Sequence, residues 1–380
     1  MKKTTTGKTQ KVLLLSVLAA ILSLTHCGRE QPWKPGQPLA KEKIKIGVIH
    51  PNETTEVSEY DYAHYMGTVH MQRDLELWED QIIRKINVFD ADAVAAENAM
   101  RDCIAEGANI ILAPSWGYMD TCEKLSVQYP SVVFAHGLGH KYNSANFTNF
   151  SGRAYQARYL SGIVAGMKTR TNKLGYVAAM GKDSSEVSAG LNAFALGVES
   201  VNPAARVHVK VTYSWIDRMG ETEAANALIA RGCDVITAHV NTPSAQIAAQ
   251  KAGVWAIGFN TDMRKDAPRA VITSVVLNWG VYYTYLVRSV MNGSFTTRPY
   301  FGGIAEAMVS ITPLSEELAP PGAKEAVEAV RQRMMSGEFN VFDGELKTND
   351  GQTVGTEGAT LPDSEIIGGI HWYYRNVVES

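Results

Sequence analysis

The sequence predicts an α/β fold with two lobes, each built around a doubly wound parallel sheet and joined to the other by a hinge. Short β-branched apolar runs alternate with helical patterns along the chain, which is typical of βαβ units with right-handed crossovers. The predicted units are too numerous for one sheet. The 380 residues, 45% of them hydrophobic, also exceed what one compact core normally contains. We therefore expect two lobes.

The expected strands are continuous apolar runs, which indicates burial on both faces of a parallel sheet. Pro and Gly residues mark helix ends before some of these runs, as in "NPAARVHV" and "GCDVIT". The pattern predicts strands at residues 43–50, 85–90, 109–115, 131–137, 173–180, 206–214, 233–240, 254–260 and 270–276.

Helical patterns fill the stretches between these runs. They predict helices at Tyr62–Leu77, Ala91–Cys103, Ala154–Met167, Val187–Val201, Glu221–Ala230 and Trp279–Met291. A (β/α)₈ barrel is the alternative fold. It is disfavoured because no strand–helix register closes at eight, and because the stretch after Pro320 is long and expected to be irregular.

Residues 1–26 have the features of a signal peptide, since the basic start "MKKTTTGKTQK" precedes the apolar run "VLLLSVLAAILSLT". No later stretch reaches the roughly 18 apolar residues of a membrane-spanning helix. Cys27 ends the run and is similar to the acylated cysteine of a lipoprotein, although His26 replaces the usual small residue. We expect residues 27–42 to be a lipidated tether, which places the protein outside the cytoplasm on the cell membrane. A secreted protein without lipid is the alternative.

Charge and cysteine content argue against a nucleic-acid-binding protein and against a protein held together by a disulfide framework. The net charge of −3 becomes −7 when the four lysines of the signal are removed, which argues against nucleic-acid partners. Cys103, Cys122 and Cys233 show no CxxC spacing, and three thiols cannot all pair. A disulfide framework is not expected, although one disulfide bond is an alternative for a protein outside the cytoplasm.

Ligands of open α/β sheets bind beyond the carboxyl ends of the strands, where this sequence places aromatic, amide and carboxyl side chains. Aromatic faces can stack on a flat heterocycle, while amides and carboxylates bind its polar edge. The ligand-binding candidates are Tyr60, Asp61, Ser115, Trp116, Trp215, Asn241, Asn260 and Asp262.

Catalytic motifs are absent from the sequence: it has no G-x-S-x-G elbow, no H-E-x-x-H and no P-loop. His136 and His140 in "HGLGH" are expected to be loop residues, not metal ligands. We therefore predict no catalytic residue, no metal site and no cofactor. An exported hydrolase acting on a nucleoside-like substrate is the weaker alternative. A sensor would need a further domain, for which the short tether leaves no room.

Several motifs together resemble the basic membrane protein family of solute-binding lipoproteins. They are "SWGYMD", "RYLSGIVAGMKTRTNKLGYVAAM", "LNAFALGVESVNP", "YSWID", "GFNTDM" and "SVVLNWGVYYT", and the similarity runs from about residue 43 to the end. The family serves ABC importers and binds nucleosides, purine bases or, in spirochaetes, riboflavin. The resemblance implies a type I periplasmic binding fold, a small-molecule ligand and permease partners. The lobes would be residues 43–148 with about 275–305, and residues 149–274 with about 306–380.

The resemblance also assigns roles to site residues. Aligning on Ala63 and His64 places Tyr60 where purine-binding members have a ring-stacking tryptophan, and Trp215 matches the second aromatic of that clamp. Asn241 replaces an aspartate of the family, while Asp262 keeps an acid. The altered loop and Asn241 favour a ring other than adenine. Riboflavin is therefore the favoured ligand, and a purine base or nucleoside is the alternative.

Overall fold

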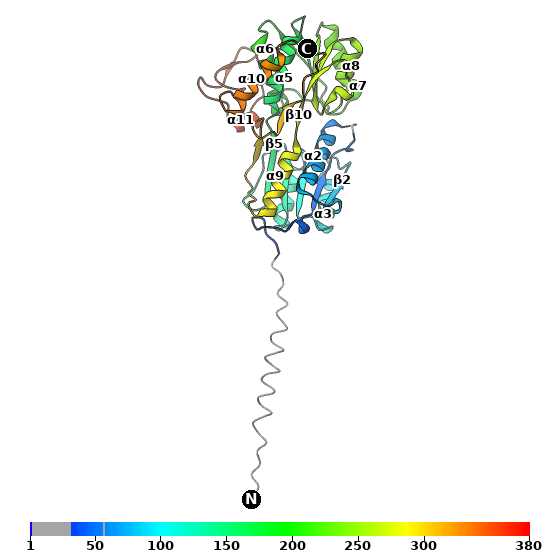
Figure 1. Ribbon diagram of the computed structural model, residues 1–380, viewed down its shortest axis with the longest axis vertical. Coiled ribbons are helices and arrows are strands. Elements are labelled where there is room, and N and C mark those ends of the chain that lie inside the picture. Colours follow the sequence, from blue (N-terminus) through cyan, green and yellow to red (C-terminus); the bar gives the residue numbers. More distant parts are fainter. Residues whose placement is uncertain (2–31, 56–57) are drawn as a thin grey trace. The chain divides into compact units, whose positions relative to one another are not determined.

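Two separate sheets organise the residues beyond Lys34 (Figure 1). The computed structural model describes residue 1, residues 32–55 and residues 58–380. The signal peptide, Cys27 and the first part of the tether lie outside the described residues. Residues 35–380 form one unit.

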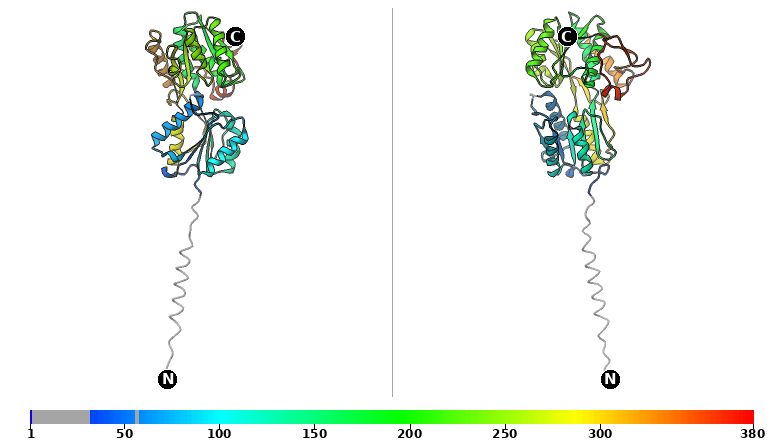
Figure 2. Two further views of the ribbon diagram at one scale, coloured as in Figure 1. Left: turned by 90° about the vertical axis from the view of Figure 1, so that its right-hand side faces the viewer. Right: turned by 180° about the vertical axis from the view of Figure 1, so that it is seen from behind.

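The first sheet has six strands, all paired in parallel, in the order β11-β5-β4-β3-β1-β2. The helices α2 and α9 cover one face of this sheet, and α3 and α4 cover the other (Figure 2). Its strands are β1 (Ile46–Ile49), β2 (Ile82–Lys85), β3 (Ile110–Ala113), β4 (Val133–Gly137), β5 (Phe147–Gly152) and β11 (Tyr300–Gly302). Its helices are α2 (Glu59–Leu75), α3 (Ala93–Ala105), α4 (Met119–Gln128) and α9 (Trp279–Asn292).

The second sheet has the order β12-β10-β9-β8-β6-β7-β15, and β12 is its antiparallel strand. Figure 1 shows α5 and α6 on one side of this sheet and α7 and α8 on the other. Its strands are β6 (Lys173–Ala178), β7 (Arg206–Val211), β8 (Val235–His239), β9 (Trp255–Asn260), β10 (Val271–Leu277), β12 (Val309–Ile311) and β15 (Val377–Glu379). Its helices are α5 (Ala154–Lys168), α6 (Ser185–Val201), α7 (Arg218–Ala230), α8 (Ser244–Ala252), α10 (Ala323–Met335) and α11 (Asp363–Gly368).

Short elements complete the described chain. They are the 3₁₀ turns η1 (Lys41–Lys43), η2 (Glu79–Gln81), η3 (Trp116–Tyr118) and η4 (Met263–Lys265), and a two-stranded ribbon of β13 (Leu346–Lys347) and β14 (Thr353–Val354).

The chain passes between the lobes three times: from β5 to α5, from β10 to α9, and from β11 to β12. α9 returns to the first lobe and packs closely on α2, since a Cβ at Gly67 would lie 2.9 Å from the backbone nitrogen of Gly280. The expected boundaries at residues 148 and 274 fall inside β5 and β10. At the level of single residues, the lobe boundaries therefore stay a prediction.

Several predicted elements need correction. The strand expected at residues 85–90 is wrong: β2 ends at Lys85, and Asn87 has a φ of +57°, outside the extended range of regular strands. The stretch after Pro320 is not irregular throughout, because "AKEAVEAVRQRMM" forms α10. Its Ala, Glu, Arg and Met residues are strong helix formers, a local signal that was overlooked. α4, α8 and β5 were also not predicted.

Three cysteines are buried and free, so no bridge forms between them: Cys103, Cys122 and Cys233. Cys103 and Cys122 lie in the core between the first sheet and helices α3 and α4, and Cys233 lies in the core of the second lobe. Burial raises the pKa of the Cys103 and Cys233 thiols to about 12. These thiols are therefore inert core residues.

Candidate ligand-binding cleft

Four residues connect the two lobes where the carboxyl ends of their strands face each other. The backbone N–H of Glu59, at the start of α2, donates to the carbonyl oxygen of Asn241 at 2.9 Å. The buried Glu59 carboxylate accepts a hydrogen bond from Thr261 Oγ1 and lies 3.4 Å from Lys265 Nζ. We call Glu59, Asn241, Thr261 and Lys265 the interlobe latch. Burial raises the pKa of Glu59 in this position.

Asp61 secures the loop that precedes α2. Its carboxylate is buried and accepts hydrogen bonds from Ser58 Oγ at 2.6 Å and from Asn52 Nδ2 at 3.0 Å. His50 Nδ1 lies 3.9 Å away, and burial raises the pKa of Asp61. The carboxylate is therefore already used in holding the loop. Contact between Asp61 and a ligand stays a prediction.

Tyr60 rests on a stack of buried aromatic rings. Its hydroxyl donates to the carbonyl oxygen of Pro114 at 2.8 Å, and its ring meets the His64 ring edge to face at 4.4 Å. His64 is stacked on Trp279 at 4.1 Å and hydrogen-bonds the Tyr283 hydroxyl at 2.6 Å. His64 and Trp279 are buried core residues, and their rings support the ring of Tyr60.

Trp215, His239 and Phe259 lie together near the strand ends of the second lobe, and we call them the aromatic wall. The His239 ring meets Phe259 edge to face at 4.4 Å and lies 5.9 Å from the ring of Trp215. His239 Nδ1 lies 3.3 Å from the Tyr176 hydroxyl, and burial lowers the pKa of the imidazole. This wall combines aromatic faces with a neutral polar ring, a mixture suited to a flat heterocycle.

The buried side chain of Arg158 packs against the aromatic wall. The guanidinium of Arg158 donates to Thr237 Oγ1 at 3.2 Å and to the carbonyl oxygen of Ala238 at 2.9 Å. It also lies 4.0 Å from the centre of the Phe259 ring, which is a cation–π geometry. Burial lowers the pKa of Arg158. Its contacts fix the end of β8 and the face of Phe259.

Two predicted amide residues lie together at the strand ends of the second lobe. Asn260 Nδ2 donates to Asn241 Oδ1 at 3.2 Å, and both residues are buried. Asn260 has a φ of +68°, a left-handed conformation that asparagine tolerates better than most residues. The backbone N–H of Asn241 donates to the carbonyl oxygen of Trp215 at 2.8 Å. Trp215, Asn241 and Asn260 therefore form one connected group.

The other predicted site residues have partners of their own. Ser115 Oγ donates to Asp90 Oδ2, and Trp116 is 59% exposed on η3. The Asp262 carboxylate pairs with Arg264, which lowers its pKa. Ligand contacts by these three residues stay predictions.

Several residues of the candidate site are not among the sequence candidates: Glu59, Thr261 and Lys265 of the interlobe latch, and Glu186, His239 and Phe259. The sequence candidates follow a strand, whereas His239 is the last residue of β8 and Phe259 the last but one of β9. Glu186 lies in the first turn of α6, which no strand-end rule identifies. A rule that also includes the last two residues of each strand identifies both rings.

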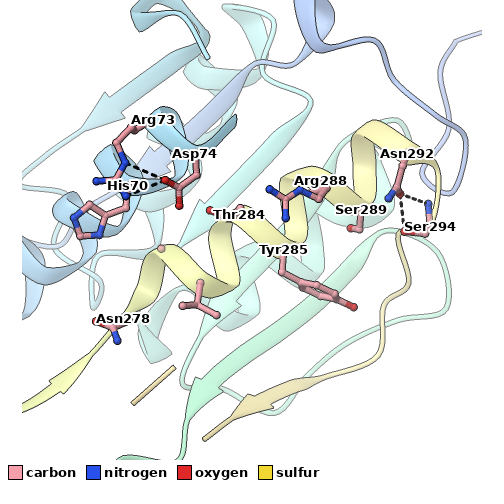
Figure 3. A pocket seen from close by; sticks show the side chains of 12 residues that line it. His70, Arg73, Asp74, Asn278, Thr284, Tyr285, Arg288, Ser289, Asn292 and Ser294 are labelled. Carbon is pink, nitrogen blue, oxygen red and sulfur yellow. Dashed lines mark hydrogen bonds and ion pairs between the residues drawn. The ribbon is translucent and has the colours of Figure 1, made fainter. Parts of the chain in front are cut away.

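The structure has a small and a larger cavity, which lie in different places. A small one of about 50 Å³ lies beside the crossing strands and includes Glu186, Gly152 and Phe301 in its lining. A larger one of about 480 Å³ lies on the first lobe along α2 and α9. Figure 3 shows the polar lining of the larger cavity, where Arg73 is already paired with Asp74. None of the sequence candidates lines either cavity. We place the candidate site at the junction of the two lobes, where Glu59 contacts Asn241 and Thr261.

The described residues contain no group of three or more His, Cys, Asp and Glu side chains that could hold a metal ion. His136 Nε2 lies 3.0 Å from the carbonyl oxygen of Lys141, which gives this histidine a structural role. In the described part of the chain, no helix has the length and apolarity needed to cross a membrane.

Comparison with known proteins identifies the family. Residues 45–341 match the family model described as ABC transporter substrate-binding protein PnrA-like. The chain is 31% identical to a purine-binding protein of Brucella abortus over 90% of its own length and 95% of the relative's. It is 30% identical to a Haloferax volcanii protein named for glucose binding in an ABC transporter, over 84% of the chain and 79% of the relative.

A solved solute-binding protein of an ABC transporter system from Conexibacter woesei has the same fold. Its TM-score is 0.65 at 20% identity, over 78% of this chain and 98% of that one. The predicted type I periplasmic binding fold is thereby confirmed. The family match over most of the sequence, together with the two-lobed fold and its aromatic cleft, leads to one conclusion: the chain belongs to the PnrA-like family of ABC transporter substrate-binding proteins.

Proposed function

We propose that this ABC transporter substrate-binding protein binds a purine base or nucleoside in the cleft between its lobes and delivers it to the permease subunits of an importer. Substrate-binding proteins of ABC importers are extracytoplasmic, and the family is one of transport proteins. The observation that carries the proposal is the junction of the two lobes, where Glu59, the neighbour of Tyr60, donates to Asn241, which in turn donates to Trp215. It brings the ring-bearing ends of both lobes together.

Purine replaces riboflavin as the favoured ligand. The sequence alone favours riboflavin because the loop before Tyr60 and Asn241 depart from the pattern of purine-binding members. One relative at 31% identity is named for purine binding, and neither relative described above is named for riboflavin. An aromatic wall with buried amides also suits a purine, which offers two flat faces and a polar edge.

Isothermal titration calorimetry with the mature protein tests the proposal. The panel is adenine, guanine, hypoxanthine, adenosine, guanosine, riboflavin and glucose, and each bound ligand should also raise the melting temperature. We expect micromolar or tighter binding of at least one purine and no comparable binding of riboflavin or glucose. Tight binding of riboflavin or glucose alone would overturn the purine assignment while leaving the transport family intact.

Anchoring to the cell membrane through Cys27 is a separate proposal. It is supported by the position of the cysteine at the end of the apolar run and by the Pro- and Gly-containing stretch that follows it.

A further inference from the structure

Glu186, in the first turn of α6, lines the small cavity beside the crossing strands and lies near His239 without forming a hydrogen bond. Glu186 Oε1 lies 3.8 Å from His239 Nε2, which is beyond hydrogen-bond distance. Among the described residues, His239 Nε2 has no hydrogen-bond partner, although the side chain is only 1% exposed. A buried polar atom without a partner is costly unless a further group completes its hydrogen bond.

The hydrogen-bonding capacity of His239 follows from its surroundings. The groups around the ring are the Tyr176 hydroxyl from β6, the Arg158 guanidinium from α5 and the Glu186 carboxylate from α6. Burial lowers the pKa of the imidazole and so disfavours its charged form, although the Glu186 carboxylate acts in the opposite direction. When Tyr176 donates to Nδ1, Nε2 carries the proton and is a donor from which no described residue accepts.

Glu186 supplies the complementary group. Its side chain is 41% exposed and lines the small cavity beside the crossing strands, so its carboxylate is accessible and not committed to the protein interior. A carboxylate only accepts hydrogen bonds at neutral pH, whereas the adjacent imidazole donates.

We propose that Glu186 and His239 together bind the edge of the ligand ring, with the carboxylate accepting from a ring or exocyclic N–H and Nε2 donating to the neighbouring ring nitrogen or carbonyl oxygen. This inference rests on the proposed function, since it assigns the specificity of the same cleft. The ligand class that it selects is a neutral heterocycle with an N–H donor directly beside an acceptor. Rings in which that donor is alkylated are excluded.

The discriminating variant is Glu186→Gln, because the amide can present a donor where the carboxylate only accepts. The ligands are adenine, hypoxanthine and riboflavin, together with 9-methyladenine, N6,N6-dimethyladenine and 1-methylhypoxanthine, which each lack one or more N–H donors. Binding is measured by calorimetry. The matched control is Glu223→Gln, the same change at an exposed position of α7.

We expect wild type to bind one parent base about ten- to a hundredfold more tightly than its alkylated analogue. Glu186→Gln should weaken binding of the parent base by a similar factor, so that the ratio of the affinities for the parent base and its analogue comes close to one. Glu223→Gln should keep the wild-type ratio. His239→Asn should also weaken the parent base. The melting temperature of His239→Asn shows whether this variant, at a buried position, still folds. If it does not fold, Glu186→Gln alone tests the proposal.

The outcomes separate the two proposals. If wild type binds no base of this panel and also no guanine, adenosine or guanosine, the proposed function fails. If wild type binds a purine but Glu186→Gln keeps both the affinity and the ratio between parent and analogue, the role of the pair is overturned and the proposed function stands. Selective binding of riboflavin by wild type, lost in Glu186→Gln, would support the pair while overturning the purine assignment.

Discussion

The backbone N–H of Glu59 donates to the carbonyl oxygen of Asn241 at 2.9 Å and so joins the first helix of one lobe to the loop after β8 in the other. The Glu59 side chain strengthens this junction through Thr261 and Lys265. A binding protein of this fold exchanges between open and closed arrangements, and a ligand selects the arrangement that it contacts better. The interlobe latch is the set of contacts that opening must break.

Weakening the interlobe latch should favour the open arrangement. Thr261→Val removes the hydroxyl that donates to Glu59, and Lys265→Met removes the neighbouring charge. Each variant should weaken ligand binding by about three- to tenfold, since hydrogen bonds of this kind contribute about 0.5–1.5 kcal/mol. Small-angle scattering should show a larger radius of gyration in the absence of ligand. The control is Lys251→Met, at the end of α8. Equal radii of gyration in wild type and in the latch variants would contradict the role of the latch.

Truncating either ring of the predicted clamp should cost most of the stacking energy. Tyr60→Ala and Trp215→Ala should each weaken ligand binding by roughly ten- to a hundredfold, as expected for about 1–3 kcal/mol of stacking per ring. Tyr60→Phe should cost much less, because the ring and its contact with His64 remain while only the bond to Pro114 is lost. The measurement is calorimetry with the best ligand. The control is Trp78→Ala, which truncates an exposed tryptophan. Wild-type affinity in both Tyr60→Ala and Trp215→Ala would show that the two rings only support the fold.

Glu221 should make the stability of the second lobe depend on pH. This buried carboxyl accepts from Thr242 Oγ1 and from the backbone N–H of Asp217, and burial raises its pKa from 4.5 to about 7. Because the folded pKa is raised, its contribution to stability is fully present below pH 4.5 and is lost as the pH rises to about 7.

Glu221→Gln removes this titration. We expect the variant to gain stability relative to wild type between pH 4.5 and 8, by an amount on the order of 3 kcal/mol. Thermal unfolding of both proteins across this range measures the difference, with Glu223→Gln as an exposed control on the same helix. A stability difference that stays constant with pH would show that Glu221 does not titrate in this range.

Cys27→Ser should release the protein from the membrane. The thiol is the predicted site of acylation, and two or three acyl chains anchor firmly because each buried methylene contributes about 0.8 kcal/mol. Partitioning into detergent measures the effect, with His26→Ser as a neighbouring substitution that keeps the thiol. Equal partitioning of wild type and Cys27→Ser would contradict lipid anchoring.

The fold could be predicted from the sequence because its signals are local. Buried parallel strands such as Ile110–Ala113 and Val235–His239 are continuous apolar runs, and the helices between them keep a regular period. β5 was missed because "FTNFSG" contains polar residues that become buried only by pairing with neighbours on both sides. That burial is a tertiary effect which no local pattern contains.

The site was predictable only in part, for a related reason. A strand-end rule finds aromatic and amide residues such as Trp215 and Asn260, because their position along one strand is enough. Asp61 and Asp262 show the limit of that rule, since their partners Ser58 and Arg264 already use the carboxylates. The separation between Glu186 and His239 depends on the packing of α6 against the second sheet, which the sequence alone does not provide.

The three passages of the chain between the lobes also set the order in which the protein can fold. The first sheet needs β11 at Tyr300–Gly302, and α2 is covered by α9, so the first lobe cannot be completed before residue 302 is available. The second sheet in turn receives its edge strand β15 only at Val377–Glu379. A chain that enters the extracytoplasmic space from its N-terminus therefore finishes neither lobe early. Contacts between residues so distant in sequence form slowly, so both lobes reach their native packing late and almost together.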